Sequence, residues 1–226
     1  MNPKQRAGEK ATEFVRDGMN VGLGTGTTVY WTIQRLGAMV REGLHIRGIP
    51  TSRRTEQQAI EAGIPLTSFA EVTELDLTID GADEINPSFD LIKGGGGALL
   101  REKLVAAASR QLIVVADGSK QVATLGKFPL PVEVVPFAWE VTARRIAAFG
   151  CTPTLRAVDG QPYVSDNGNY ILDCRFGAIP DPATLHRDLK LLVGVVETGL
   201  FVGMADVAVI GSESGVSILK RGESRP

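Results

Sequence analysis

The segment from Asp80 to Lys103, DGADEINPSFDLIKGGGGALLREK, gathers carboxylates and lysines, side chains suited to acid–base chemistry, within one short part of this 226-residue chain. It begins with the acids Asp80, Asp83 and Glu84, and a run of four glycines, Gly94–Gly97, then leads into a good helix-forming stretch. Carboxylates can take and return protons, and the free N–H groups at the start of a helix attract anions. This combination suits chemistry on a small, negatively charged, polyhydroxylated substrate.

A second glycine-rich segment, Gly22–Thr28, reads GLGTGTT. Its third glycine comes one residue too early for a dinucleotide fingerprint, no Lys-Ser/Thr pair marks a phosphate-binding P-loop, and no ribose-binding acid follows about 20 residues on. A nicotinamide cofactor is therefore disfavoured. The turn offers N–H groups and two hydroxyls at a helix start, which predicts phosphate binding, with a plain tight turn as the alternative.

The residues alone leave the roles of the charged groups open. Asp80, Asp83 and Glu84 fit a magnesium site, solvated loop acids, or direct acid–base use. Lys93 and Glu102 fit either a functional site or ordinary surface charges.

The surrounding elements predict how these groups are positioned. Asp80 closes the apolar run Leu75–Ile79, so it should lie at the carboxyl end of a buried strand, where open α/β sheets build their sites. Strand and helix patterns alternate, and the unbroken apolar run Leu112–Ala116 is typical of a parallel sheet. Strands are expected at residues 19–23, 46–49, 75–79, 112–116 and 207–211. The pattern predicts an α/β fold with a doubly wound, mostly parallel sheet.

A proline-punctuated segment, residues 128–136, breaks this rhythm and suggests a boundary or crossover. Beyond it, two helices and short antiparallel strands at residues 154–158, 163–164, 170–174 and 194–197 predict a smaller α+β unit. We therefore expect residues 1–127 and 202–226 to form a Rossmann-like catalytic domain and residues 128–201 an inserted α+β domain.

Composition limits the partners and the compartment. A net charge of −2 and a pI of about 5.8 provide no general attraction to nucleic acid. No apolar stretch approaches the roughly 20 residues that span a bilayer, and the first ten residues lack a signal-peptide core, which predicts a cytoplasmic protein without membrane contact. Cys151 and Cys174 are expected to be buried or partly buried thiols.

The motifs DGADE, KGGGGALLREK, GLGTGTT, DGSK, GKFPLPVEV and DNGN are spread along nearly the whole chain. In their order and spacing they resemble the ribose-5-phosphate isomerase A family. The resemblance implies an aldose–ketose isomerase that interconverts D-ribose 5-phosphate and D-ribulose 5-phosphate through an enediolate, in the non-oxidative branch of the pentose phosphate pathway. It implies no metal and no cofactor, and a homodimer or homotetramer. The apolar edge Val193–Phe201 is a candidate subunit contact, with an internal packing face as the alternative.

The resemblance also assigns residues. It implies that Glu102 is the catalytic base and that Asp80, Asp83 and Lys93 act on the sugar, whereas Glu84 is a structural or capping acid. The implied substrate-binding residues are Thr25, Gly26, Thr27, Thr28, Gly81, Ala82, Gly94, Gly95, Gly96, Lys120 and Lys4. Gly118 stands where some members carry alanine, which leaves the position of Lys120 less constrained. The rival functions are a sugar-phosphate deaminase and a non-catalytic sugar-phosphate sensor.

Overall fold

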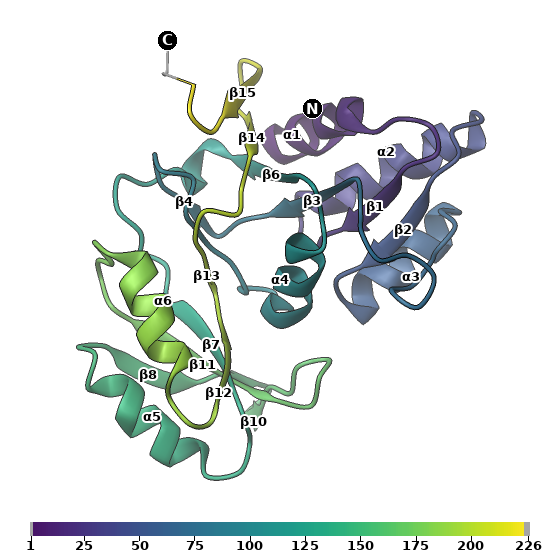
Figure 1. Cartoon of the computed structure of the whole chain (residues 1–226). Coiled ribbons are helices and arrows are strands. Elements are labelled where there is room, and N and C mark those ends of the chain that lie inside the picture. Colours follow the sequence, from purple (N-terminus) through teal and green to yellow (C-terminus); the bar gives the residue numbers. More distant parts are fainter. Residues whose placement is uncertain (1, 224–226) are drawn as a thin grey trace. The chain divides into compact units, whose positions relative to one another are not determined.

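The computed structural model describes residues 2–223 and divides into two compact units (Figure 1). The second unit comprises Asp83–Leu100 and Val122–Gly203, and the first comprises the rest of the described chain. The second unit thus contains a stretch, Asp83–Leu100, that we expected in the larger domain. Residues 1 and 224–226, at the ends of that expected domain, lie outside the described residues.

The first unit is built on a six-stranded sheet, which confirms the predicted α/β class (Figure 1). Its order is β15-β14-β6-β3-β1-β2, and all neighbours are parallel except β15, which runs antiparallel to β14. The strands are β1 (Asn20–Leu23), β2 (Arg47–Pro50), β3 (Leu77–Gly81), β6 (Leu112–Asp117), β14 (Val207–Gly211) and β15 (Val216–Lys220). The edge strand β15 was not predicted, because its residues are mostly exposed and carry no continuous apolar run.

Helices pack on this sheet and end at recognisable signals. They are α1 (Pro3–Ala11), α2 (Val29–Arg41), α3 (Arg53–Ala62) and α4 (Leu99–Ala107), with short 3₁₀ turns at Thr12–Phe14 and Gly118–Lys120. The Ser52 hydroxyl caps α3 by accepting the N–H of Thr55, and Gly63 ends the helix in the left-handed conformation. Thr28 occupies the N-cap position of α2, but its side chain makes no capping hydrogen bond.

The strand order creates a topological switch point between β1 and β3. From β1 the chain proceeds to its neighbour β2 on one side and then crosses to β3 on the other side. Ligands of open α/β sheets bind where the order reverses in this way, outside the carboxyl ends of the strands. The segment Gly24–Thr28, called here the threonine turn, follows β1, and Asp80 lies at the end of β3.

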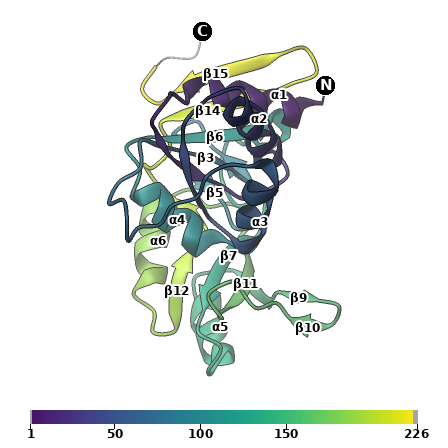
Figure 2. The same cartoon turned by 90° about the vertical axis from the view of Figure 1, so that its right-hand side faces the viewer.

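The second unit contains a four-stranded antiparallel sheet of order β12-β7-β11-β8, in which β8 is labelled in Figure 1 and the other three strands are labelled in Figure 2. Its strands are β7 (Leu130–Val134), β8 (Thr152–Leu155), β11 (Tyr170–Arg175) and β12 (Val195–Thr198), and its helices are α5 (Trp139–Ala147) and α6 (Pro182–Lys190). A three-stranded sheet joins β4 (Glu84–Ile85), β5 (Leu91–Ile92) and β13 (Leu200–Phe201), and β9 (Ala157–Val158) pairs with β10 (Gln161–Pro162). Two helices over an antiparallel sheet match the predicted α+β layer.

Several boundaries differ from prediction. The proline-rich crossover contains the interior strand β7, because Leu130, Val132 and Val134 supply an alternating apolar face that outweighs the one N–H missing at Pro131. The expected strand at residues 154–158 is divided into β8 and β9, with Arg156 between them. Residues 163–164 form no strand, and only an isolated bridge joins Val164 to Tyr170.

Alternation of side chains gives the four-stranded sheet two different faces. Val132 of β7 belongs to a buried cluster with Leu172 and Cys174 of β11, and this cluster also contains Ile146 of α5 and Leu189 of α6. Successive side chains of a strand point to opposite faces of the sheet. Residues between the cluster members, such as Glu133 and Asp173, therefore lie on the face away from the helices.

Candidate active site

Asp80 ties the end of β3 to the threonine turn. Its Oδ1 accepts hydrogen bonds from the N–H groups of Thr25 at 3.0 Å and of Gly81 at 2.7 Å. Gly24 approaches so closely that a Cβ there would collide with the Asp80 carboxylate. The Asp80 carboxylate on the neighbouring strand thus requires glycine at position 24. Neither the GLGTGTT motif nor the DGADE motif reveals this contact alone.

The hydroxyl of Thr25 lies among three other hydroxyls. It lies 2.7 Å from the hydroxyl of Thr51, 2.8 Å from that of Ser52 and 3.0 Å from that of Thr55. Thr55 in turn donates to the carbonyl oxygen of Gly24 at 2.9 Å. This hydroxyl cluster, Thr25, Thr51, Ser52 and Thr55, connects the threonine turn to the start of α3, and sequence reasoning missed it.

The remainder of the threonine turn includes a contact with a distant lysine. Lys4 Nζ donates to Thr27 Oγ1 at 3.1 Å, although the two residues are 23 positions apart. Gly26 has a φ of 135°, which L side chains rarely adopt, and Thr28 is buried whereas Thr27 is exposed.

Asp117, at the end of β6, is attracted electrostatically by both predicted lysines, Lys4 and Lys120. Burial raises its pKa, but hydrogen bonds from the hydroxyl and N–H of Ser119 and attraction by the two lysines outweigh that effect, and the pKa is lowered. A surface pocket of about 460 Å³ is lined in part by Lys4, Asp117 and Ser119. The first unit therefore holds hydroxyls and two cations near the carboxyl ends of β1 and β6.

Glu102 and Lys93 are both buried. Glu102 lies in the first turn of α4 and is 4% exposed, so it is not a surface helix acid. Lys93 is 2% exposed, its N–H donates to the carbonyl oxygen of Gly199 at 2.9 Å, and its Nζ lies 5.4 Å from the centroid of the Phe201 ring. Charged side chains are almost never buried this completely without a structural or functional partner.

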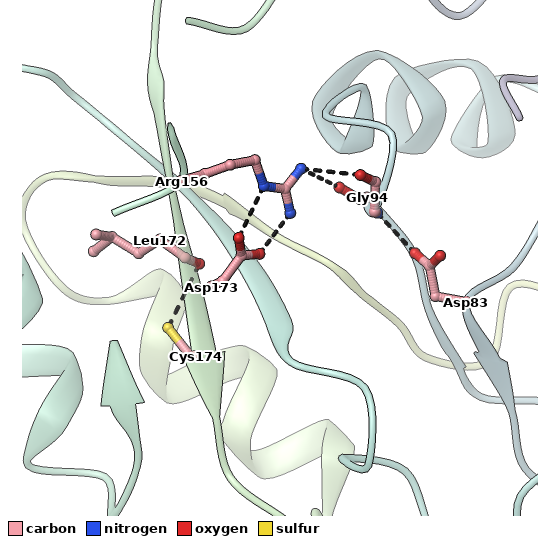
Figure 3. A network of polar contacts seen from close by, with 7 residues as sticks. Asp83, Gly94, Arg156, Leu172, Asp173 and Cys174 are labelled. Atoms are coloured by element: carbon pink, nitrogen blue, oxygen red, sulfur yellow. Dashed lines mark hydrogen bonds and ion pairs between the residues drawn. The ribbon is translucent and has the colours of Figure 1, made fainter. Parts of the chain in front are cut away.

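Asp83 holds the glycine loop, Gly94–Gly97, within the second unit. Its Oδ2 accepts the N–H of Gly95 at 2.7 Å, and a Cβ on Gly95 would lie only 2.6 Å from the Asp83 Oδ1. The N–H of Gly97 closes the loop onto the carbonyl oxygen of Gly94 at 2.9 Å. Arg156 also contacts this loop (Figure 3). No sequence motif marked Arg156, since a lone arginine inside the strand expected at residues 154–158 reads as a surface charge.

Ala82 and Glu84 are the other two residues of the DGADE motif, and Glu84 contacts a different part of the chain from Asp80 and Asp83. Ala82 is a half-buried link between Gly81 and Asp83. Glu84 accepts the N–H groups of Gly126 at 2.7 Å and Phe128 at 2.6 Å. These two contacts are those expected of a structural acid, the role predicted for Glu84.

Within residues 2–223, no group of three or more His, Cys, Asp or Glu side chains is arranged to hold a metal ion. Over the same residues, no helix has the length and apolar character needed to cross a bilayer. Cys151 is half-buried and Cys174 buried, and both are free thiols as predicted.

The fold and its polar groups define a class, namely α/β proteins with a glycine- and threonine-rich turn at a sheet switch point. A profile of the family described as ribose 5-phosphate isomerase A (phosphoriboisomerase A) matches residues 47–215. The chain is 57% identical over 217 residues to ribose-5-phosphate isomerase A of Bacillus mycoides, covering 96% of this chain and 98% of that protein. It is 51% identical over 224 residues to the enzyme of that name from Parvibaculum lavamentivorans, covering 96% and 97% of the two chains.

Solved structures agree with these sequence relatives. Ribose 5-phosphate isomerase from Plasmodium falciparum superposes with a TM-score of 0.94 at 38% identity, covering 97% of this chain and 98% of that one. A D-ribose-5-phosphate isomerase in complex with phospho-erythronic acid also has a TM-score of 0.94 at 38% identity, covering 98% and 100%. The chain belongs to the ribose 5-phosphate isomerase A family.

Proposed function

We propose that the chain interconverts D-ribose 5-phosphate and D-ribulose 5-phosphate through an enediolate, with the substrate held and converted by the residues described above. The observation that carries this assignment is the burial of three ionisable side chains at motif positions: Asp80 is 1% exposed, Lys93 2% and Glu102 4%. Ionisable groups withdrawn from water in this way are concentrated at catalytic sites.

The first chemical task is to open the sugar ring. One group must take the proton of the anomeric hydroxyl and another must protonate the ring oxygen. Asp80, Asp83 and Lys93 are the groups assigned to these transfers. Asp80 and Asp83 are each fixed by backbone N–H groups, which keeps their carboxylates in one orientation.

The second task is to move a proton between neighbouring carbons. Glu102 removes the proton from C2 and returns it to C1, acting first as a base and then as an acid. The negative charge that develops on the two oxygens needs donors that are already in place. Lys93 and the N–H groups of the glycine loop, in particular that of Gly96, supply them.

The third task is to hold the phosphate. The proposed phosphate cradle consists of the N–H of Gly26, the hydroxyls of Thr27 and Thr28, and the ammonium groups of Lys4 and Lys120. Thr25 stabilises the threonine turn through the hydroxyl cluster. The bound phospho-erythronic acid of the related structure is a phosphorylated sugar acid, which supports a ligand of this kind.

We propose self-association as part of the same function. The expected contact edge Val193–Phe201 is only partly available, because Leu200 and Phe201 are fully buried in the unit. Val193, Leu191 and Phe137 are 80%, 77% and 89% exposed, and large exposed apolar side chains favour a subunit contact in this part of the second unit.

The test is turnover of ribose 5-phosphate against free ribose, in excess chelator, with detection of the ketose. The phosphate forms several charge-assisted hydrogen bonds, each worth about 1.5 to 3 kcal/mol, so catalytic efficiency on ribose should be at least about 10³-fold lower. Thr28→Val should reduce the difference in catalytic efficiency between the two sugars. Comparable rates of the wild-type protein on the two sugars would refute the proposed phosphate cradle. Ammonia release from an amino-sugar phosphate would favour the deaminase, and binding without turnover the sensor.

A further inference from the structure

Arg156 and Asp173 form an ion pair on the helix-free face of the four-stranded sheet (Figure 3). The guanidinium donates from Nε to Asp173 Oδ2 at 2.9 Å and from Nη2 to Oδ1 at 2.5 Å. The side chains are only 14% and 26% exposed, respectively. A two-pronged pair with this burial holds the guanidinium plane in one orientation, which an exposed ion pair does not do.

The remaining nitrogen of the guanidinium reaches the glycine loop. Arg156 Nη1 donates to the carbonyl oxygen of Gly94 at 2.9 Å and to that of Gly95 at 3.2 Å. The loop is also covered by Tyr163, whose hydroxyl end lies where a Cβ of Gly97 would be, and the Tyr163 ring lies 5.9 Å from the Arg156 guanidinium carbon.

These contacts fix the direction of two peptide groups. The peptides are trans, so each carbonyl points opposite to the N–H of the next residue. In the Gly94–Gly95 peptide, Arg156 binds the carbonyl and Asp83 binds the N–H on the opposite side. In the Gly95–Gly96 peptide, Arg156 again binds the carbonyl, so the N–H of Gly96 points away from Arg156.

We propose that Arg156, held by Asp173, is a positioning residue that directs the N–H of Gly96 toward the reacting oxygens of the substrate. This inference rests on the proposed function. Without the guanidinium, the Gly95–Gly96 peptide is free to rotate, since glycine has few conformational restraints, and a rotated peptide would present a carbonyl oxygen to the developing negative charge.

The variants separate positioning from general folding. Arg156→Ala should lower kcat about 10²-fold, the usual effect of misplacing a catalytic group by about 1 Å, while KM changes little. Arg156→Lys retains the charge but cannot bind Asp173 and both carbonyls together, so its kcat should also fall at least about 10-fold. Arg187→Ala, which removes an exposed arginine paired with Asp188 on α6, is the matched control and should leave kcat unchanged.

Chemical rescue and coupling complete the test. Methylguanidinium, at concentrations that leave circular dichroism unchanged, should restore part of the kcat of Arg156→Ala but not that of Glu102→Gln. Asp173→Ala added to Arg156→Ala should cost little more, because the two residues act as one unit. A folded Arg156→Lys or Arg156→Ala variant with wild-type kcat, or a loss that methylguanidinium leaves unchanged, would overturn the proposal. If the wild-type protein itself fails to isomerise ribose 5-phosphate, the proposed function is wrong instead.

Discussion

The hydroxyl cluster around Thr25 leads to a prediction that can be quantified from the structure. Thr25→Val preserves the shape of the side chain and removes its three hydroxyl contacts, to Thr51, Ser52 and Thr55. A neutral hydrogen bond contributes about 0.5 to 1.5 kcal/mol net, so three sum to about 1.5 to 4.5 kcal/mol. Ser52 and Thr55 retain their mutual contact at 3.0 Å in the variant. The expected loss in the free energy of unfolding therefore lies near the middle of this range, at about 2 to 3 kcal/mol.

The assay is thermal and urea unfolding followed by circular dichroism, together with steady-state kinetics. For a chain of this length, the expected loss lowers Tm by about 4 to 12 °C. Thr25→Ser retains the hydroxyl and should lose no more than about 1 kcal/mol, the contribution of one buried methyl group. KM for ribose 5-phosphate should rise in Thr25→Val because the threonine turn loses its support. Unfolding of Thr25→Val at the wild-type temperature, or an equal loss in Thr25→Ser, would contradict this account.

Three further predictions concern the charged groups. Glu102→Gln keeps the shape of the side chain but removes the proposed proton acceptor, so kcat should fall at least about 10²-fold and exchange of the substrate C2 proton with solvent should disappear with it; persistent exchange would assign the base elsewhere. Activity should survive prolonged chelation and should not increase on adding magnesium, because the proposed mechanism uses Asp80 and Asp83 directly; strict metal dependence would exclude that role. Asp117 has a lowered pKa, so it stabilises the fold above about pH 4, its unfolded value, and loses this contribution as pH falls through the folded value. Unfolding of Asp117→Asn between about pH 2 and pH 7 should therefore show a deficit at neutral pH that shrinks in acid, and a constant deficit would refute the assignment.

Local patterns in the sequence were sufficient for much of the fold. The helix-forming run Arg53–Ala62 is followed by Gly63, a helix-stopping residue, and the structure has α3 over that run. Strand β6 lies where the unbroken apolar run predicted it, and β3 lies two residues further along the chain than the expected strand at residues 75–79. Such features depend on hydrophobic periodicity, capping and glycine conformation within a few residues, and these are properties of the sequence itself.

Motif order along the chain also indicated the chemistry. Asp80 at a strand end and Glu102 one turn into a glycine-led helix follow from positions in the sequence, and the structure shows that both side chains are buried. The sequence left open whether Lys93 was a surface charge, because burial of a lysine depends on what packs over it rather than on its neighbours in the chain.

Tertiary structure alone decided the contacts that support these groups. Thr25 meets Thr55 across 30 positions, and Arg156 meets Gly94 across 62. No local pattern encodes such pairs, since each depends on how separate strands and helices are brought together, and the same threonine or arginine on an exposed element would only be solvated. The sequence by itself determined the parallel strands of the larger sheet and which side chains have the chemistry to transfer protons or to bind phosphate. The folded chain determined which hydroxyls, carbonyls and guanidinium groups hold the threonine turn and the glycine loop in place, because only packing brings residues distant in sequence within hydrogen-bonding distance.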